Sequence, residues 1–270
     1  MLRIASLAAR LALALVATLA QGADIYVMTS GGFTAALNEL APRYARETGD
    51  KLVIVYGASM GATPTAIPAR LARGEPADVV ILARAALDGL VADGKVSRGV
   101  ETDLARSLIG VAVKEGAPVP DISTVDALKR TLLAAKSVAW SDSASGVYIQ
   151  NEMLDKMGIA AEVKAKGTMV PGTPVGLNVA RGEQEIGFQQ ISELLPVKGI
   201  HIVGPLPAPV QHVTVHVAGI AVGRRLIEYL ASPKAWEEIR TLRRHSVYSW
   251  NHAQTARCNP PLRAFCVPTS

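Results

Sequence analysis

The chain has 270 residues, of which 49% are hydrophobic and only 4% aromatic, and it carries a formal net charge of +5 at pH 7. A chain of this size can build one large core or two smaller ones, mainly from aliphatic residues. The charge is modest and no Lys/Arg run exceeds two residues, as in Arg243–Arg244, which argues against a nucleic-acid-binding protein.

The first 22 residues have the pattern of a secretory leader. Arg3 provides an early positive charge, residues 4–19 are mostly apolar, and Ala20 and Gly22 stand at positions −3 and −1 of a possible cleavage point. An uncleaved membrane anchor is the alternative, but the apolar run is short and rich in Ala. We therefore predict a cleaved signal peptide over residues 1–22 and a mature protein in the periplasm.

Strand and helix patterns alternate in the segment that follows the leader. The predicted strands are 25–28, 51–56 and 78–82, and the predicted helices are 33–47, 61–73 and 85–93. Pro68 indicates that the second of these helices starts late or is kinked. This alternation is typical of an α/β fold with a parallel sheet and right-handed connections.

The same alternation restarts near residue 108. The predicted strands are 108–113, 137–140, 162–165, 185–189, 200–203 and 213–217, with a buried run at 218–222. The predicted helices are 124–134, 147–157, 174–181, 224–230 and 233–242.

The tail from 243 to 270 loses apolar periodicity, and we predict an irregular extension there. Its two cysteines, Cys258 and Cys266, either form a disulfide in an oxidising compartment or stay as thiols. With His252 nearby they do not make a convincing metal site, and the sequence holds no other metal-binding motif.

Three predicted strands end in small, hydroxyl-bearing turns that open helices. Their candidate ligand residues are Ser30, Gly31, Ser59, Met60, Ser143 and Ser145. Each turn alone is an ordinary helix N-cap. Together, however, helix starts offer unpaired N–H donors, and strand ends of open α/β sheets meet at clefts. The three turns therefore predict an anion site between two lobes.

Four segments resemble the molybdate-binding branch of the type II periplasmic solute-binding proteins. Their motifs read Thr-Ser-Gly-Gly, Tyr-Gly-Ala-Ser, Gly-Glu-Pro-Ala-Asp-Val-Val-Ile and Ile-Gly-Phe-Gln-Gln-Ile-Ser-Glu, in residues 25–44, 55–61, 74–82 and 185–193. The resemblance covers about residues 24–240. It implies two α/β lobes, each a mainly parallel sheet flanked by helices, joined by two crossover strands and holding an oxyanion between them.

The resemblance also implies lobe limits and ligand residues. The first lobe would comprise residues 23–106 plus 217–242, and the second residues 107–216. Ser30 and Ser59 would be hydroxyl ligands from the first lobe. The segment 143–148, which ends in Tyr148, would be the helix start of the second.

This chain departs from the molybdate binders at one informative position. Gln190, which follows Gln189, stands where that branch places a Tyr. An amide is both donor and acceptor, which suits a carboxylate or a mixed carboxylate and hydroxyl ligand. Arg70, Arg73 and Arg84 lie near the first-lobe motifs, and we expect them to be solvated or ion-paired rather than a carboxylate clamp.

Two classes of function remain open, with the first favoured. One is a monomeric binding protein that delivers a tricarboxylate or an oxyanion to the membrane permease of an ABC-type importer. The other, implied by the same branch of the fold, is an aconitate isomerase, which moves a double bond by allylic proton transfer without a cofactor. Its candidate catalytic residues are Tyr148, Ser30 and Ser59, with Gln189 and Gln190 as orienting groups.

Two further points bear on the choice. His201, His212 and His216 would be the usual proton shuttles, but they lie in or beside predicted strands, and we predict structural roles for them. An exported protein with a decayed site is a third interpretation. It is favoured by the absence of a surface segment between residue 222 and the last predicted helices, and by the unmatched tail.

Overall fold

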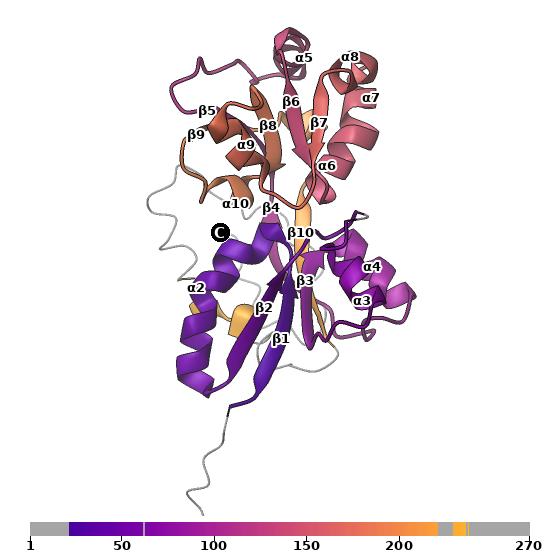
Figure 1. The fold of residues 1–270 in the computed structure, drawn as a ribbon, viewed down its shortest axis with the longest axis vertical. Coiled ribbons are helices and arrows are strands. Elements are labelled where there is room, and N and C mark those ends of the chain that lie inside the picture. The colour runs from indigo at the N-terminus through magenta and orange to yellow at the C-terminus, as the bar shows by residue number, and fades with distance from the viewer. Residues whose placement is uncertain (1–21, 62, 221–228, 236, 238–270) are drawn as a thin grey trace, which may run out of the picture.

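A computed structural model describes residues 22–61, 63–220, 229–235 and 237, and it shows two lobes that each contain a five-stranded sheet (Figure 1). Lobe I is the sheet β2-β1-β3-β10-β4 with its helices, and lobe II is the sheet β7-β6-β8-β5-β9 with its helices. The strands are β1 Asp24–Thr29, β2 Lys51–Tyr56, β3 Val79–Ala83, β4 Thr102–Ser107, β5 Ile109–Lys114, β6 Val138–Ser141, β7 Gly167–Val170, β8 Ile186–Gln190, β9 Ile200–Pro205 and β10 Thr214–Ile220.

Helices flank both sheets. They are α2 Gly31–Thr48, α3 Ile67–Ala72, α4 Arg84–Ala92, α5 Val125–Ala134, α6 Ala144–Tyr148, α7 Leu154–Lys156, α8 Ala160–Lys164, α9 Val175–Arg181 and α10 Ile191–Leu194. A π-helical turn, η1 Ile149–Met153, joins α6 to α7, and a short 3₁₀ turn, η2 Ala208–Val210, precedes β10. No described helix is both long and apolar enough to cross a membrane.

The chain crosses between the lobes twice, and the crossings explain the strand directions. In lobe I, β10 pairs antiparallel with β3 and β4, whereas β1, β2 and β3 are mutually parallel. In lobe II, β5 pairs antiparallel with β8 and β9, whereas β6, β7 and β8 are parallel. The reversed strand in each sheet is the one that has just arrived from the other lobe. The sheets are therefore mainly parallel, as predicted, and the carboxyl ends of their forward strands face the other lobe.

The core of lobe I lies on both faces of its sheet. Helix α2 buries Phe33, Leu37, Leu40 and Tyr44 at helical spacing against one face. On the other face, apolar residues of α3 and α4, including Ile67 and Leu87, cover Met28, Val80 and Leu82. These two layers fix the start of α2 above the carboxyl end of β1.

Lobe II has a core of its own. Val111, Val138 and Phe188 from its sheet pack with Leu128 of α5 and Met153 of η1. A smaller cluster of Ala139, Val170, Val175 and Val179 lies under α9 on the opposite face. Each lobe thus supports its half of the space between them.

Most predicted elements are confirmed, including β2 at its predicted bounds and the late start of α3, which has Pro68 in its first turn. The strand predicted at 162–165 is wrong. Gly158, with φ 64°, ends the preceding helix, and the strong helix formers that follow build α8, so the strand comes later, as β7. The predicted helix at 147–157 begins earlier, at Ala144, and contains η1.

Strand β4 was not predicted, because its sequence TDLARS lacks an apolar alternation. It forms because β10 pairs beside it. The lobe limits given above stay predictions. The predicted leader, the irregular tail, Cys258 and Cys266 lie outside the described residues, and so do most residues of the helices predicted at 224–230 and 233–242.

Two glycines in helices allow a matched test of the packing beside the interlobe space. A Cβ at Gly146 would lie 1.6 Å from the backbone oxygen of Ser141, whereas a Cβ at Gly89, in the exposed face of α4, would meet nothing within 4 Å. We predict that Gly146→Ala destabilises the protein by roughly 1–3 kcal/mol, because the contact is with backbone that cannot turn aside. Gly89→Ala should stabilise it by about 0.5–1 kcal/mol. Urea denaturation of both variants measures this, and equal effects of the same sign would contradict it.

Candidate functional site

A cleft of about 500 Å³ lies between the lobes at the carboxyl ends of the strands. Its walls come from the segments after β1, β2, β6, β7 and β8, which is where open α/β sheets bind ligands. The lining residues are Gly31, Thr34, Ala35, Asn38, Tyr56, Gly57, Ala58, Thr65, Ser141, Asp142, Ser143, Gly172, Thr173, Pro174, Gln189, Ser192, Glu193 and Pro196. Most are small, hydroxyl-bearing or amide side chains.

Hydrogen bonds join the two lobes along the cleft. The backbone N–H of Ser59 donates to Ser143 Oγ at 3.1 Å, and Thr63 Oγ1 donates to Asp142 Oδ2 at 3.4 Å. At the crossover, the hydroxyls of Ser107 and Ser192 lie 3.1 Å apart. These contacts hold the lobes close together.

The predicted first-lobe residues lie at or directly beneath the cleft. Gly31 lines it, and Ser30, the N-cap of α2, is 1% exposed with an Oγ that has no hydrogen-bond partner among the described residues. Ser59 is equally buried, and its Oγ accepts the backbone N–H of Ala83 at 3.0 Å. Met60 is partly buried and is not among the lining residues.

The predicted second-lobe hydroxyls form one small network. Ser143 lines the cleft and is the N-cap of the helical stretch that begins at Ala144. Ser145 is buried, and its Oγ lies 3.1 Å from Ser141 Oγ, which lines the cleft. The three turns predicted from the sequence therefore meet at one place.

Gln189 and Gln190 are the last two residues of β8, and their side chains have different hydrogen-bond partners. Gln189 lines the cleft, where its Oε1 accepts the Val175 N–H at the start of α9 at 2.8 Å. Gln190 is 2% exposed, and its Nε2 donates to Thr214 Oγ1 of β10 at 2.7 Å, while its Oε1 has no partner among the described residues. Gln190 thus ties lobe II to the crossover.

Tyr148 is not among the lining residues of the cleft. Its hydroxyl donates to the backbone oxygen of Val210 at 2.9 Å, and its ring stacks on His212 with centroids 4.7 Å apart. Burial in the lobe II core raises the pKa of its hydroxyl. This geometry does not favour the predicted catalytic role for Tyr148, because its proton already has an acceptor away from the cleft.

Two carboxylates that the sequence prediction did not select line the cleft, Asp142 and Glu193. Asp142 Oδ2 accepts the Gly172 N–H at 3.2 Å as well as the Thr63 hydroxyl. Glu193 Oε1 accepts Gln189 Nε2 at 3.0 Å and lies against Gly31, where an added Cβ would be only 1.8 Å from it. Glu193 follows Gln189 by four residues, but the two belong to different elements, β8 and α10, so no helical spacing pattern could have selected it.

The environment of Glu193 favours its protonated form. Burial raises the pKa of this carboxyl to about 7 and the charge of Asp142 adds to the rise, while hydrogen bonds from Gln189 and the Gln190 backbone oppose it. The carboxyl therefore titrates near neutral pH, inside the cleft.

None of the described lining residues is basic. Arg70 and Arg73 pair with Glu75 at 2.7 Å each, and Arg84 pairs with Asp103, as expected for ion-paired arginines. In the described part of the chain, no group of three or more His, Cys, Asp or Glu side chains could hold a metal ion. Any negative charge on a ligand would therefore be met by hydroxyls, amides and helix starts.

His216, on β10, lies beneath the first turn of α2. It is 2% exposed, burial lowers its pKa to about 4, and neither ring nitrogen has a partner among the described residues. An added Cβ at Gly32 would be 2.2 Å from its ring. His201 is exposed on β9. His216 thus packs as a neutral ring in lobe I, next to the residue on which Glu193 lies.

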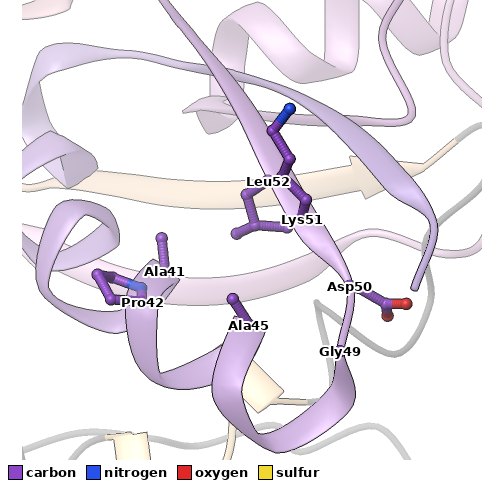
Figure 2. A pocket seen from close by; sticks show the side chains of 7 residues that line it. All are labelled: Ala41, Pro42, Ala45, Gly49, Asp50, Lys51 and Leu52. Atoms are coloured by element: carbon purple, nitrogen blue, oxygen red, sulfur yellow. The ribbon is translucent and has the colours of Figure 1, made fainter. Parts of the chain in front are cut away.

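A second hollow, of about 350 Å³, lies in lobe I between the later turns of α2 and the start of β2 (Figure 2). Ala41, Ala45 and Leu52 supply much of its wall. Its carboxylate, Asp50, accepts the Tyr44 hydroxyl at 2.9 Å and the Ala23 N–H at 3.1 Å. Those contacts are structural, and they lie at the amino end of β2, away from the interlobe cleft.

The two buried serines of lobe I should respond differently to removal of their hydroxyls. Ser59→Ala leaves the Ala83 N–H without its acceptor and should cost about 1–3 kcal/mol of unfolding free energy. Ser30→Ala removes a buried hydroxyl without a protein partner and leaves no donor without its acceptor, so it should cost clearly less than Ser59→Ala. Thermal or urea unfolding of both variants gives the comparison, and a larger loss for Ser30→Ala would contradict it.

Glu193 should make the protein less stable as pH rises. Its pKa is about 7 in the folded protein against an ordinary 4.5, so the folded state binds more protons in this interval and its stability falls from about pH 4.5 to about pH 7. We predict that Glu193→Gln raises the melting temperature at pH 8 but changes it little at pH 4. The stability contributed by His216 depends on pH in the opposite direction. Wild type and Glu193→Gln both contain His216, however, so it does not affect the difference between their melting temperatures. A melting-temperature difference that is the same at both pH values would refute this.

Sequence and structure comparisons place this architecture in a known family. The family model for the bacterial extracellular solute-binding proteins matches residues 25–241. The aconitate isomerase of a Pseudomonas species is 48% identical over 220 residues, which are 79% of this chain and 84% of that protein. The molybdate-binding protein ModA of Azotobacter vinelandii is 25% identical over 239 residues, 84% of this chain and 91% of that protein.

Solved structures agree on the fold. The periplasmic molybdate-binding protein of Azotobacter vinelandii superposes with a TM-score of 0.64 at 22% identity, over 80% of this chain and 96% of its own. PEB3 of Campylobacter jejuni with bound L-phospholactate gives 0.60 at 16% identity, over 80% and 97%. Two α/β lobes linked by two crossings are the type II periplasmic binding-protein fold. The chain belongs to the bacterial extracellular solute-binding proteins, a family that works outside the cytoplasm.

Proposed function

We propose that this protein is a periplasmic aconitate isomerase, exported by the leader at residues 1–22. The carrying observation is the 48% identity to an aconitate isomerase across 84% of that protein, against 25% to a molybdate-binding protein. This reverses the order of the two functions considered from the sequence. The chemistry of the cleft supports the same choice.

One of the two carboxyl groups in the cleft weighs against a simple oxyanion carrier. Asp142 and an ionised Glu193 repel any anion, aconitate included, so their charge does not distinguish the two guests. A carrier of an inorganic anion, however, needs only hydrogen-bond donors and has no use for a carboxyl that exchanges a proton. A proton-transfer enzyme, in contrast, needs a carboxyl group that can give and take a proton near neutral pH. Glu193 supplies such a group.

The remaining cleft groups suit a tricarboxylate. The start of the 18-residue helix α2 and the start of the helical stretch at Ala144 both face the cleft and present positive dipole ends. Hydroxyls of Ser143 and Thr173 can donate to carboxylate oxygens, and the unpartnered Ser30 hydroxyl lies at the first of these helix starts. Three carboxylates fixed in this way would hold the reacting carbons in place.

A monomeric binding protein that serves a membrane permease is the second candidate. This second function is favoured by the family, which is one of solute-binding proteins, and by the molybdate-binding protein whose solved structure has the same fold. Such a carrier requires reversible closure of the lobes and no proton transfer. It would bind the same anions without changing them.

The two functions differ in one measurement. We predict that the purified mature protein converts trans-aconitate to cis-aconitate, detected by chromatography, and shows no comparable thermal stabilisation by molybdate. Citrate, which has three carboxylates but no double bond, is the control for binding without reaction. Stabilisation by trans-aconitate with no cis-aconitate formed would support the carrier and refute the isomerase.

A further inference from the structure

We propose that Glu193 is the residue that carries the proton during isomerisation, lifted from one carbon of aconitate and returned to another. This inference rests on the proposed function and names the catalytic residue of that same site. It differs from the sequence prediction, which selected Tyr148, Ser30 and Ser59 for this role.

The position of Glu193 is the first argument. It belongs to α10, which begins directly after β8 in lobe II, yet its carboxyl lies on Gly31 at the start of α2 in lobe I. A group in this position faces any ligand held between the lobes. Gly31 has no side chain, so the carboxyl can lie directly against the start of α2, and both residues line the cleft.

The way Glu193 is held is the second argument. Gln189 donates to its Oε1 at 3.0 Å, and Gln189 is itself fixed because its Oε1 accepts the Val175 N–H at 2.8 Å. The carboxyl is therefore oriented by an amide that stabilises the ionised form, while burial favours the neutral form. A carboxyl balanced in this way can act first as base and then as acid.

Other candidates in the cleft are less suited. Asp142 already accepts the Gly172 N–H and the Thr63 hydroxyl, and these bonds link the walls of the cleft. Tyr56 donates its hydroxyl proton to Asn38 Oδ1 at 2.7 Å and is half exposed. His216 lies behind Gly32 and is not among the lining residues.

The surroundings leave few other charges near Glu193. Helix α10 packs on α2, α9, β5 and β8. The nearby titratable side chains are Asp142, which follows the neighbouring strand β6 in the same lobe, and His216 beneath the next residue of α2. The charged residues of the packed elements lie beyond the first turn of α2 or at the far ends of β5 and α9: Glu39, Arg43, Arg46, Glu47, Lys114 and Arg181.

The step balances without any further reactant. The Glu193 carboxylate takes a proton from the methylene carbon of aconitate, and the C–H electron pair forms a double bond to the central carbon. The original π pair moves to the former vinylic carbon, which takes the proton back from the Glu193 carboxylic acid. No bond of the carbon skeleton breaks, no group leaves and nothing is oxidised, while the geometry at the double bond can change from trans to cis.

The test compares Glu193→Gln with wild type in turnover and in binding. We predict that Glu193→Gln lowers kcat by a factor of about 10² to 10⁴, the usual share of general acid–base catalysis, while calorimetry shows trans-aconitate binding at least as tight as wild type. The surface variant Glu162→Gln, the same change at an exposed position of α8, should keep wild-type turnover.

Two further readouts separate a catalytic role from a structural one. Deuterium incorporation into trans-aconitate in D₂O should be lost in Glu193→Gln together with turnover. The limb of the wild-type pH–rate profile that reports the base should also disappear from the residual activity. Glu193→Asp keeps a carboxyl and should retain measurable turnover, which covers the case in which the Gln variant folds poorly.

The outcomes are distinct. Turnover by Glu193→Gln within tenfold of wild type would overturn the assignment of Glu193 and leave the isomerase intact. Absence of turnover in the wild type would overturn the proposed function, and the role of Glu193 with it. Loss of turnover together with loss of binding would show that Glu193 binds the substrate rather than carrying its proton.

Discussion

The organisation of this protein depends on its chain passing twice between two sheets. Each passage delivers one strand, β10 or β5, that runs against its neighbours, and the forward strands consequently end at the interlobe surface. Side chains placed after five different strands then reach one cleft. The hydroxyls, the amides and the two carboxylates therefore converge because of topology, although they are scattered along the sequence.

Much of this arrangement follows from local sequence signals. Alternating β-branched residues identified β2, the apolar spacing of Leu37, Leu40 and Tyr44 identified α2, and strand ends rich in Ser and Gly identified the walls of the cleft. These signals succeed because each depends on the period of one element and on the preference of helix starts for small hydroxyl residues.

Apart from the strand predicted at 162–165, which local helix formers overturn, the errors arise from contacts with distant parts of the chain. Strand β4 exists through its pairing with β10, and the hydroxyl of Tyr148 is directed by the backbone of Val210. Glu193 looks like an ordinary acidic residue in the first turn of a short helix, where a negative charge is favourable. The raised pKa of its carboxyl arises only because α2 of the other lobe covers it, and no local sequence pattern predicts that contact.

The burial of Glu193 and His216 lowers the stability of the folded protein. They lie against consecutive glycines at the start of α2, and burial moves their pKa values in opposite directions, to about 7 and about 4. Both shifts favour the uncharged form of the group. The folded protein thus keeps a neutral His216 and an only partly ionised Glu193 under one helix start near neutral pH, and this burial of titratable groups costs stability.

The hydrogen bonds between the lobes also bear on how fast a ligand can enter. The bonds of Ser59 to Ser143 and of Thr63 to Asp142 join the two walls of the cleft, so they must break before the lobes can separate. A molecule arriving from solution must wait for these bonds to open, and its association rate then reflects the frequency of opening rather than of collision. The apparent affinity for this molecule is also lowered, in proportion to the fraction of protein molecules that are open, because only open molecules can accept it.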